Sequence, residues 1–262
     1  MHSIWIKTAV WSIVALIASF MILPIAVVLV SSFSGTEFLT FPPSEYSFQW
    51  YRKFLGDERW LAALYRSILI GLMSCVMATV MGFMAAYALV RGRFRAKKLV
   101  LSLMMTPLIV PGVITAISLY FVSAPLGLTG NIFWISLCHA VISVPIVLLI
   151  LLSSLQGVEE NLERAAFGMG ASRFTTIRRI VVPLMMPGIV SAALFSFLGS
   201  FDELIVSLFL AGVSAETLPV RVWNSLLLQI EPTIAAVSAF LVLVTLTALL
   251  LDWAVKRLRP LH

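Results

Sequence analysis

The chain has 262 residues, of which 61% are hydrophobic and only 11% are Asp, Glu, Lys or Arg. An ordinary soluble domain carries about 25% charged residues, so this chain has too little polar surface to cover its apolar side chains in water. The composition excludes a water-soluble globule and a disordered chain, and it excludes a nucleic-acid-binding domain despite the net charge of +6. We interpret the chain as an integral membrane protein.

Six stretches are apolar and nearly free of charge over the length that crosses a bilayer, about 20 residues. The first follows Lys7 and is longer than the apolar core of a signal peptide, about 7–15 residues. The uncharged stretch 99–158 is too long for one span, and turn-forming residues at 125–131 divide it. The expected spans are residues 8–30, 66–90, 99–123, 132–155, 183–211 and 232–255.

Two polar segments separate these spans. Residues 31–60 contain Pro42-Pro43 and mixed charge, and we assign them to an outer loop. Residues 156–182 form an inner loop that is unusually long for a simple connection. The spans are apolar on nearly all sides, which favours helices over the alternating strands of a barrel. We therefore predict an all-α membrane protein with six transmembrane helices in a single domain over residues 1–262.

The Lys and Arg residues indicate how the chain is oriented. With six spans both termini lie on one side of the membrane, and 13 of the 18 basic residues fall on that side. Basic residues are enriched in the cytoplasmic segments of membrane proteins. We therefore expect a multi-pass protein of the plasma membrane with both termini and the inner loop in the cytoplasm.

The sequence carries no pattern that predicts a metal site, a cofactor or catalysis. Cys75 and Cys138 lie in apolar stretches outside any CxxC, and the three histidines are scattered. The absence of HExxH, GxSxG and a grouped His/Asp set argues against a membrane-embedded enzyme. There is also no GxxxxGK[ST] loop, so the chain cannot bind ATP through a phosphate-binding loop of its own.

The inner loop has the pattern of two short helices joined by a glycine turn. Glu159 and Glu160 come early, where the N-terminus of a helix favours negative charge. Gly170 is placed as a C-terminal stop, a position that takes a left-handed backbone. Ser172 is placed to cap a second helix, and Pro183 closes the segment. The pattern predicts a helix–turn–helix lying under the membrane.

The second half of this loop contains apolar side chains among several arginines. Phe174 and Ile177 stand among Arg173, Arg178 and Arg179. One interpretation is a solvated loop that only carries the inside-positive charge. The other is a docking surface for a cytoplasmic partner, because exposed apolar side chains mark contacts.

The loop resembles the coupling segment of the inner-membrane permease subunits of ABC importers. The motif of that family reads E-A-A, three residues, G, nine residues and I-x-L-P. Ala165-Ala166 precedes Gly170 at that spacing, and residues 180–183 match the ending with Val182 in place of Leu. The resemblance implies a coupling role for Glu163, Arg164, Ala165, Ala166, Gly170, Phe174, Ile177, Ile180 and Pro183.

One motif position departs from the family pattern. The motif Glu falls on Arg164, and Glu163 stands one residue earlier, on a different face of the helix. Glu163 is able to supply a carboxylate, but its direction differs from that of the motif acid. The effect of this exchange on the coupling segment stays open at the level of the sequence.

The resemblance covers nearly the whole chain and is greatest to the spermidine/putrescine permease branch. The matching stretches are SFDEL at 200–204, LFL at 208–210, TLPVRVW at 217–223 and EPTIAAVS at 231–238. Membership would imply the type I importer permease fold and no cofactor on this chain. It would also imply two copies of an ATPase subunit that hold ATP and Mg, a second homologous permease subunit and an extracytoplasmic substrate-binding protein.

The acidic pair Asp202 and Glu203 lies at the end of the fifth apolar stretch. Acids at such depth are costly in lipid and face a wet cavity or a partner. Adjacent helical residues point about 100° apart, so we expect at most one of the two to line a translocation path for a cation. The alternative is an interfacial cap or a salt bridge to the sister subunit.

A stand-alone secondary transporter or channel is the alternative to an importer subunit. Such a protein predicts internal repeats and polar pairs in broken helices near the middle of the membrane. The sequence shows no clear repeat and a single acidic pair. Helices interrupted by Pro107, Pro111, Pro145 and Pro187 are compatible with either function, because prolines kink helices in many membrane proteins.

Overall fold

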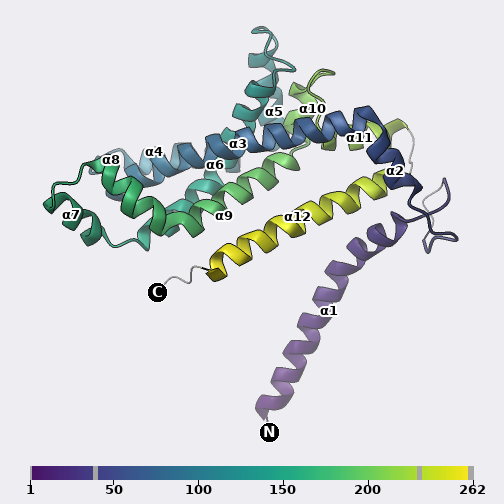
Figure 1. Cartoon of the computed structure of the whole chain (residues 1–262), viewed down its shortest axis with the longest axis horizontal. Helices are drawn as coiled ribbons and strands as arrows, with labels where there is room; N and C mark the ends of the chain where they lie inside the picture. Colours follow the sequence, from purple (N-terminus) through teal and green to yellow (C-terminus); the bar gives the residue numbers. More distant parts are fainter. Residues whose placement is uncertain (1, 38–40, 229–231, 259–262) are drawn as a thin grey trace. The chain divides into compact units, whose positions relative to one another are not determined.

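The computed structural model describes residues 2–37, 41–228 and 232–258, and the regular structure in these ranges is helical (Figure 1). Five of the described helices are long and apolar enough to cross a membrane, and a bent helix pair makes a sixth crossing if it counts as one span. The expected all-α membrane class is therefore confirmed. The elements are α1 (His2–Ser31), α2 (Gln49–Gly56), α3 (Glu58–Arg91), α4 (Lys97–Ile109), α5 (Gly112–Ser123), α6 (Ile132–Gln156), α7 (Glu160–Gly168), α8 (Arg173–Thr176), η1 (Ile177–Val181), α9 (Val182–Phe201), α10 (Ile205–Leu210), α11 (Leu218–Leu228) and α12 (Thr233–Leu258).

The chain divides into two compact units, Met1–Leu61 with Val222–Val244 and Ala62–Arg221 with Thr245–His262. In the first unit, the side chains of α1 are exposed throughout residues 10–26. Apolar side chains on all sides of a helix require lipid or another protein around them. The segment after α1 is held by an aromatic cluster in which the Phe33 ring lies 5.3 Å from the rings of both Phe48 and Tyr51.

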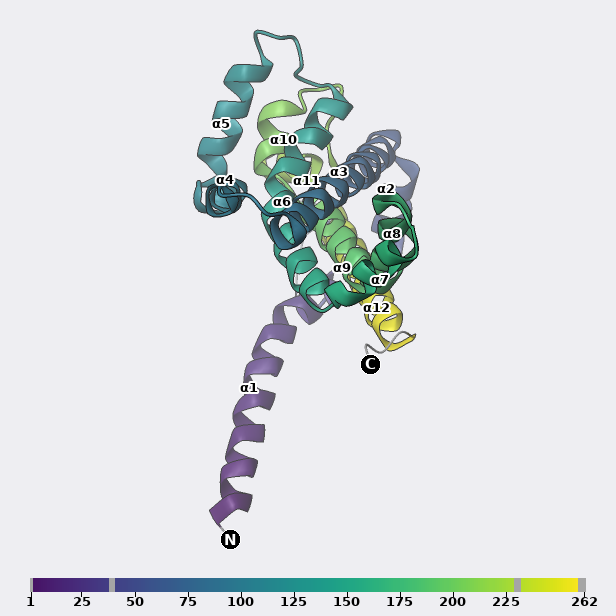
Figure 2. The ribbon, with the colours of Figure 1, turned by 90° about the vertical axis from the view of Figure 1, so that its left-hand side faces the viewer.

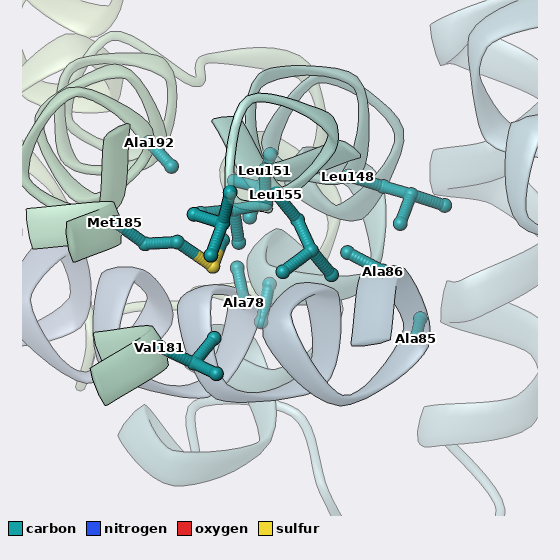
Figure 3. Packing of buried hydrophobic residues seen from close by; sticks show 12 residues of the cluster. Ala78, Ala85, Ala86, Leu148, Leu151, Leu155, Val181, Met185 and Ala192 are labelled. Carbon is teal, nitrogen blue, oxygen red and sulfur yellow. The ribbon is translucent and has the colours of Figure 1, made fainter. Parts of the chain in front are cut away.

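The second unit is built around α6, which lies beside α9 (Figure 1). Leu148, Leu151 and Leu155 of α6 are fully buried, and Figure 3 shows them gathered with Ala78 and Met185. Glycine permits the close contact of α3 with α6, since a Cβ atom at Gly82 would lie 2.6 Å from Val147 Cγ1. Small residues at such contacts are typical of helices packed in membranes.

The third expected span, residues 99–123, is not one helix. It consists of α4 and α5, which are bent by 101° at the break between them, and Figure 2 shows α5 leaving the direction of α4. Val110 is extended, with ψ of 129°, and Pro111 precedes the first residue of α5. Proline disfavours a helical residue before it and donates no hydrogen bond, so α4 ends there. Pro107 and Pro145, by contrast, lie inside α4 and α6.

The helix observed at the fifth expected span, residues 183–211, begins and ends earlier in the chain than expected. The helical path begins at Arg173 and continues through Pro183, and it ends at Phe201 before the separate helix α10. Pro183 therefore does not close the inner loop. The turn before it is the π-helix η1. A π-turn shifts the hydrogen-bond register by one residue, which accommodates a proline that lacks an N–H.

The outer segment is also more helical than expected. Residues 31–60 contain α2, and α3 begins at Glu58 and passes through Arg66, where the second span was expected to start. The charge of Arg66 does not end the helix, because a long basic side chain can lie within a helix near the membrane surface while its charged end reaches water.

Candidate functional site, the hairpin between α6 and α9

The inner loop folds into a hairpin of α7 and α8, which we call the hairpin (residues 156–182; Figure 1). Its turn is set by Gly170, whose φ is +82°. The Gly170 N–H donates to Phe167 O at 3.0 Å, and the Ala171 N–H donates to Ala166 O at 3.0 Å. This pair of bonds is the Schellman arrangement, in which a left-handed residue satisfies the last carbonyls of a helix. The left-handed turn expected at Gly170 is therefore observed.

The second arm begins with the expected serine cap. Ser172 Oγ accepts a hydrogen bond from the Thr175 N–H at 3.2 Å, and the Ser172 backbone is extended. A cap of this kind satisfies one of the unpaired N–H groups at the start of a helix. The two arms of the hairpin thus meet at a turn in which both helix ends are satisfied locally.

The hairpin exposes large apolar side chains as well as arginines. Met169 is 82% exposed and Phe174 is 73% exposed. Arg164 is exposed on α7, and Arg173, next to Phe174 in the chain, is exposed on α8. Apolar side chains of this size at a helix turn, surrounded by charge, indicate a contact surface.

The other residues of the family motif are distributed over both faces. Ala166 is buried, while Ala165 and Pro183 are exposed. Ile177 and Ile180 lie in η1 and are half-buried. The structure thus separates a buried set that holds the hairpin in place from an exposed set that is available for contact.

Glu163 faces the interior of the protein. Arg91 Nε donates to Glu163 Oε1 at 2.7 Å, and the Tyr87 hydroxyl donates to Glu163 Oε2 at 2.9 Å. Arg91 Nη2 also donates to the Val158 carbonyl at 2.6 Å. From the sequence alone, Arg91 is only one of the basic residues that set orientation. Tyr87 and Arg91 are four residues apart, which places them on one face of a helix, and this spacing is the sequence signal for a shared partner.

Arg164, which replaces the motif acid, points outward. Its Nη2 lies 2.9 Å from Glu160 Oε1, one turn earlier on α7. Hydrogen bonding to Arg164 holds the pKa of Glu160 below its ordinary value. Exposed pairs of this kind contribute little to stability. The hairpin therefore presents an arginine at the position where the family motif has a carboxylate.

The two acids of the fifth stretch have different environments. Glu203 Oε1 accepts a hydrogen bond from the Val206 N–H at 3.0 Å, so this carboxylate caps the start of α10. Asp202 directly follows the last residue of α9, and its side chain is exposed. Of the pair, Asp202 is the carboxylate that is open to another molecule.

A buried polar group that the sequence did not predict links three helices. His139 of α6 lies 2.8 Å from Ser200 Oγ through Nδ1 and 3.2 Å from Ser207 Oγ through Nε2. These serines belong to α9 and α10. A single histidine in an apolar stretch carries no signal for such partners. Within residues 2–37, 41–228 and 232–258, no three metal-binding side chains gather in one place.

Comparison with known proteins places this geometry in a family. Residues 78–260, which contain the whole hairpin, match the model of the binding-protein-dependent transport system inner membrane component. The chain belongs to this family. It is therefore a multi-pass permease component of the inner membrane, and it is a transport subunit without catalysis of its own.

Two curated relatives illustrate the range of the family. The spermidine/putrescine transport system permease protein PotC of Haemophilus influenzae is 28% identical, over 91% of this chain and 93% of that protein. The trehalose transport system permease protein SugB of Mycobacterium tuberculosis is 31% identical, over 70% of this chain and 67% of that protein.

A solved structure supports the fold. A chain of a bacterial ABC transporter involved in the import of the acidic polysaccharide alginate is similar with a TM-score of 0.73 and 17% identity, covering 100% of this chain and 99% of that one. At this identity the likeness concerns the fold alone. The expected permease fold of type I ABC importers is thereby confirmed.

Proposed function

We propose that this chain is the permease subunit of a polyamine importer and that a separate ATPase docks on its hairpin. The observation that supports docking at the hairpin is the exposure of Met169 and Phe174, which lie beside the turn at Gly170 and among arginines. Large apolar side chains in this setting contribute most when a partner covers them. A solvated loop that only balanced charge would have no use for them.

The proposal includes the rest of the assembly. Two ATPase copies hold ATP and Mg, and one of them docks on the hairpin of this chain. A second, homologous permease completes the path through the membrane, and an extracytoplasmic binding protein delivers the substrate. The hairpin and both termini lie in the cytoplasm. This orientation is supported by the 13 of 18 basic residues on that side.

Polyamines are the proposed substrate on two grounds. The relative PotC matches over nearly its whole length, and the short stretches between residues 200 and 238 resemble the same branch. The exposed carboxylate of Asp202, at the end of α9, supplies a negative charge of the kind that attracts a cation. A sugar is the second candidate, and the likeness to SugB favours it.

The test is purification of the tagged chain from native membranes, followed by reconstitution with the proteins that it retains. We expect an ATPase, a second permease and ATP-dependent uptake of spermidine or putrescine once the binding protein is added. Uptake of trehalose in place of polyamines would reject the substrate and keep the importer. Nucleotide-independent uptake by the chain alone would reject the importer and favour a secondary transporter or channel.

A further inference from the structure

We infer that the buried pair of Arg91 and Glu163 joins the hairpin to the end of α3, so that the hairpin and this span move as one body. The inference rests on the proposed function, because it names the route by which a docked ATPase acts on the membrane helices. Arg91 and Glu163 are positioning residues in this scheme, and neither is assigned a contact with ATP or with the transported solute.

The geometry places one guanidinium between two parts of the hairpin. Arg91 Nε holds the carboxylate of Glu163 on α7, and Arg91 Nη2 holds the Val158 carbonyl just after α6. Tyr87, one turn earlier on α3, donates to the second carboxylate oxygen. The pair is nearly dry, with side-chain exposures of 13% for Arg91 and 3% for Glu163. Both the entry and the first helix of the hairpin are therefore fixed to α3.

Within the hairpin, α7 packs against α8 and η1, and its link to α3 is polar. Glu163 and Ala166 are the buried residues of this nine-residue helix. A methyl group adds little burial, and a helix of this length is not stable by itself in water. The polar cluster is consequently what ties α7 directly to α3. Because a broken buried pair leaves an uncompensated charge, the attachment persists while the hairpin is pushed or pulled.

The same helix offers a matched control. Glu160 and Arg164 form a second ion pair on α7, but both side chains are more than half exposed. An exposed pair transmits little force because water replaces it at small cost. A Glu→Gln change at Glu163 or at Glu160 therefore removes the same charge from the same helix. Only the change at Glu163 breaks the joint to α3.

The first experiment measures coupling and docking separately in the assembled importer. We expect Glu163→Gln and Arg91→Lys to retain the ATPase subunit on the purified chain, because the exposed surface is intact. We expect both to lower the stimulation of ATP hydrolysis by loaded binding protein about tenfold. Tyr87→Phe removes one hydrogen bond and should have a smaller effect. Glu160→Gln should leave the stimulation unchanged.

The second experiment measures the rigid joint directly. Spin labels at Asn161→Cys on α7 and Met84→Cys on α3, with Cys75 and Cys138 replaced, report one distance across the joint. We expect this distance to be the same with and without ATP in the otherwise unaltered complex, and to broaden in Glu163→Ala. The constant distance shows that α7 and α3 move together, and the lowered stimulation with the ATPase retained in Glu163→Gln distinguishes transmission from a merely structural role.

Three results would overturn the inference. The first is full stimulation in both Glu163→Gln and Arg91→Lys. The second is loss of the ATPase subunit from Glu163→Gln, which would show that the pair only shapes the docking surface. The third is a distance between α7 and α3 that changes with ATP. Failure of the unaltered chain to retain any ATPase would instead contradict the proposed function.

Discussion

Asp202 and Glu203 are adjacent acids whose surroundings give them different roles. Glu203 accepts a hydrogen bond from the first turn of α10, whereas Asp202 is exposed at the end of α9. A carboxylate that caps a helix is committed to local structure. A free carboxylate near the membrane surface is available to a cationic solute. The translocation role that we propose therefore falls on Asp202 alone.

This difference predicts opposite results for two conservative changes. Asp202→Asn should raise the polyamine concentration needed for half-maximal uptake about tenfold, equivalent to about 1.4 kcal/mol of lost attraction. Glu203→Gln should leave that concentration unchanged and lower the thermal stability of the protein, because caps contribute about 0.5–2 kcal/mol. The measurements are uptake by reconstituted importer and the unfolding temperature in detergent. Equal uptake by Asp202→Asn and the unaltered protein would remove Asp202 from the path.

At the scale of elements, the hairpin depends on one residue with a left-handed backbone. A Cβ atom at Gly170 would meet nothing within 4 Å, so the cost of a substitution there is conformational. Gly168, two residues earlier, is equally open and is the last residue of α7. The two glycines differ in backbone conformation and in little else, which makes them a matched pair.

We predict that Gly170→Ala distorts the turn and weakens retention of the ATPase, since the left-handed conformation costs an L-residue about 1–2 kcal/mol. The β-branched change Gly170→Val should have a larger effect, and membrane insertion should persist in both variants. Gly168→Ala should be neutral or stabilising by up to about 1 kcal/mol, because alanine favours a helix over glycine. The measurement is the amount of ATPase that co-purifies with each variant. Equal loss at both positions would contradict a role for the turn.

At the scale of the whole molecule, the distribution of charge and the path of the helices both bear on orientation. The hairpin is the long polar segment on the side that carries most basic residues. Residues 41–56, with α2, belong to a segment on the opposite side if α4 and α5 together cross the membrane once. With α4 and α5 counted as one crossing bent by 101°, the described helices cross the membrane six times, and without it five times.

Labelling of single cysteines resolves this orientation. In a chain without Cys75 and Cys138, a thiol at Ser44→Cys should react with a membrane-impermeant maleimide in intact spheroplasts. A thiol at Asn161→Cys should react only in inverted vesicles, because positive segments stay in the cytoplasm. Ser44 and Asn161 are both exposed, so accessibility does not bias the comparison. Reaction of both thiols from the same side would show that α4 and α5 do not complete a crossing.

The sequence by itself determined what depends on composition and on local backbone. The shortage of charged residues required a membrane environment. The local pattern predicted a left-handed turn at Gly170 and a helix cap at Ser172, and both are observed, because a turn and a cap are decided by a few neighbouring residues. The motif spacing in the hairpin likewise pointed to the family that the comparisons identified.

Only the tertiary structure decided which prolines break a helix and which acid is buried. Pro145 stays inside α6, where packing on several sides holds the helix together, whereas Pro111 follows the end of α4. Glu163 and Arg164 are neighbours, yet one meets Arg91 and the other faces outward. Which face of α7 turns inward depends on α3, more than seventy residues away in the chain, and no local pattern encodes a partner at that separation.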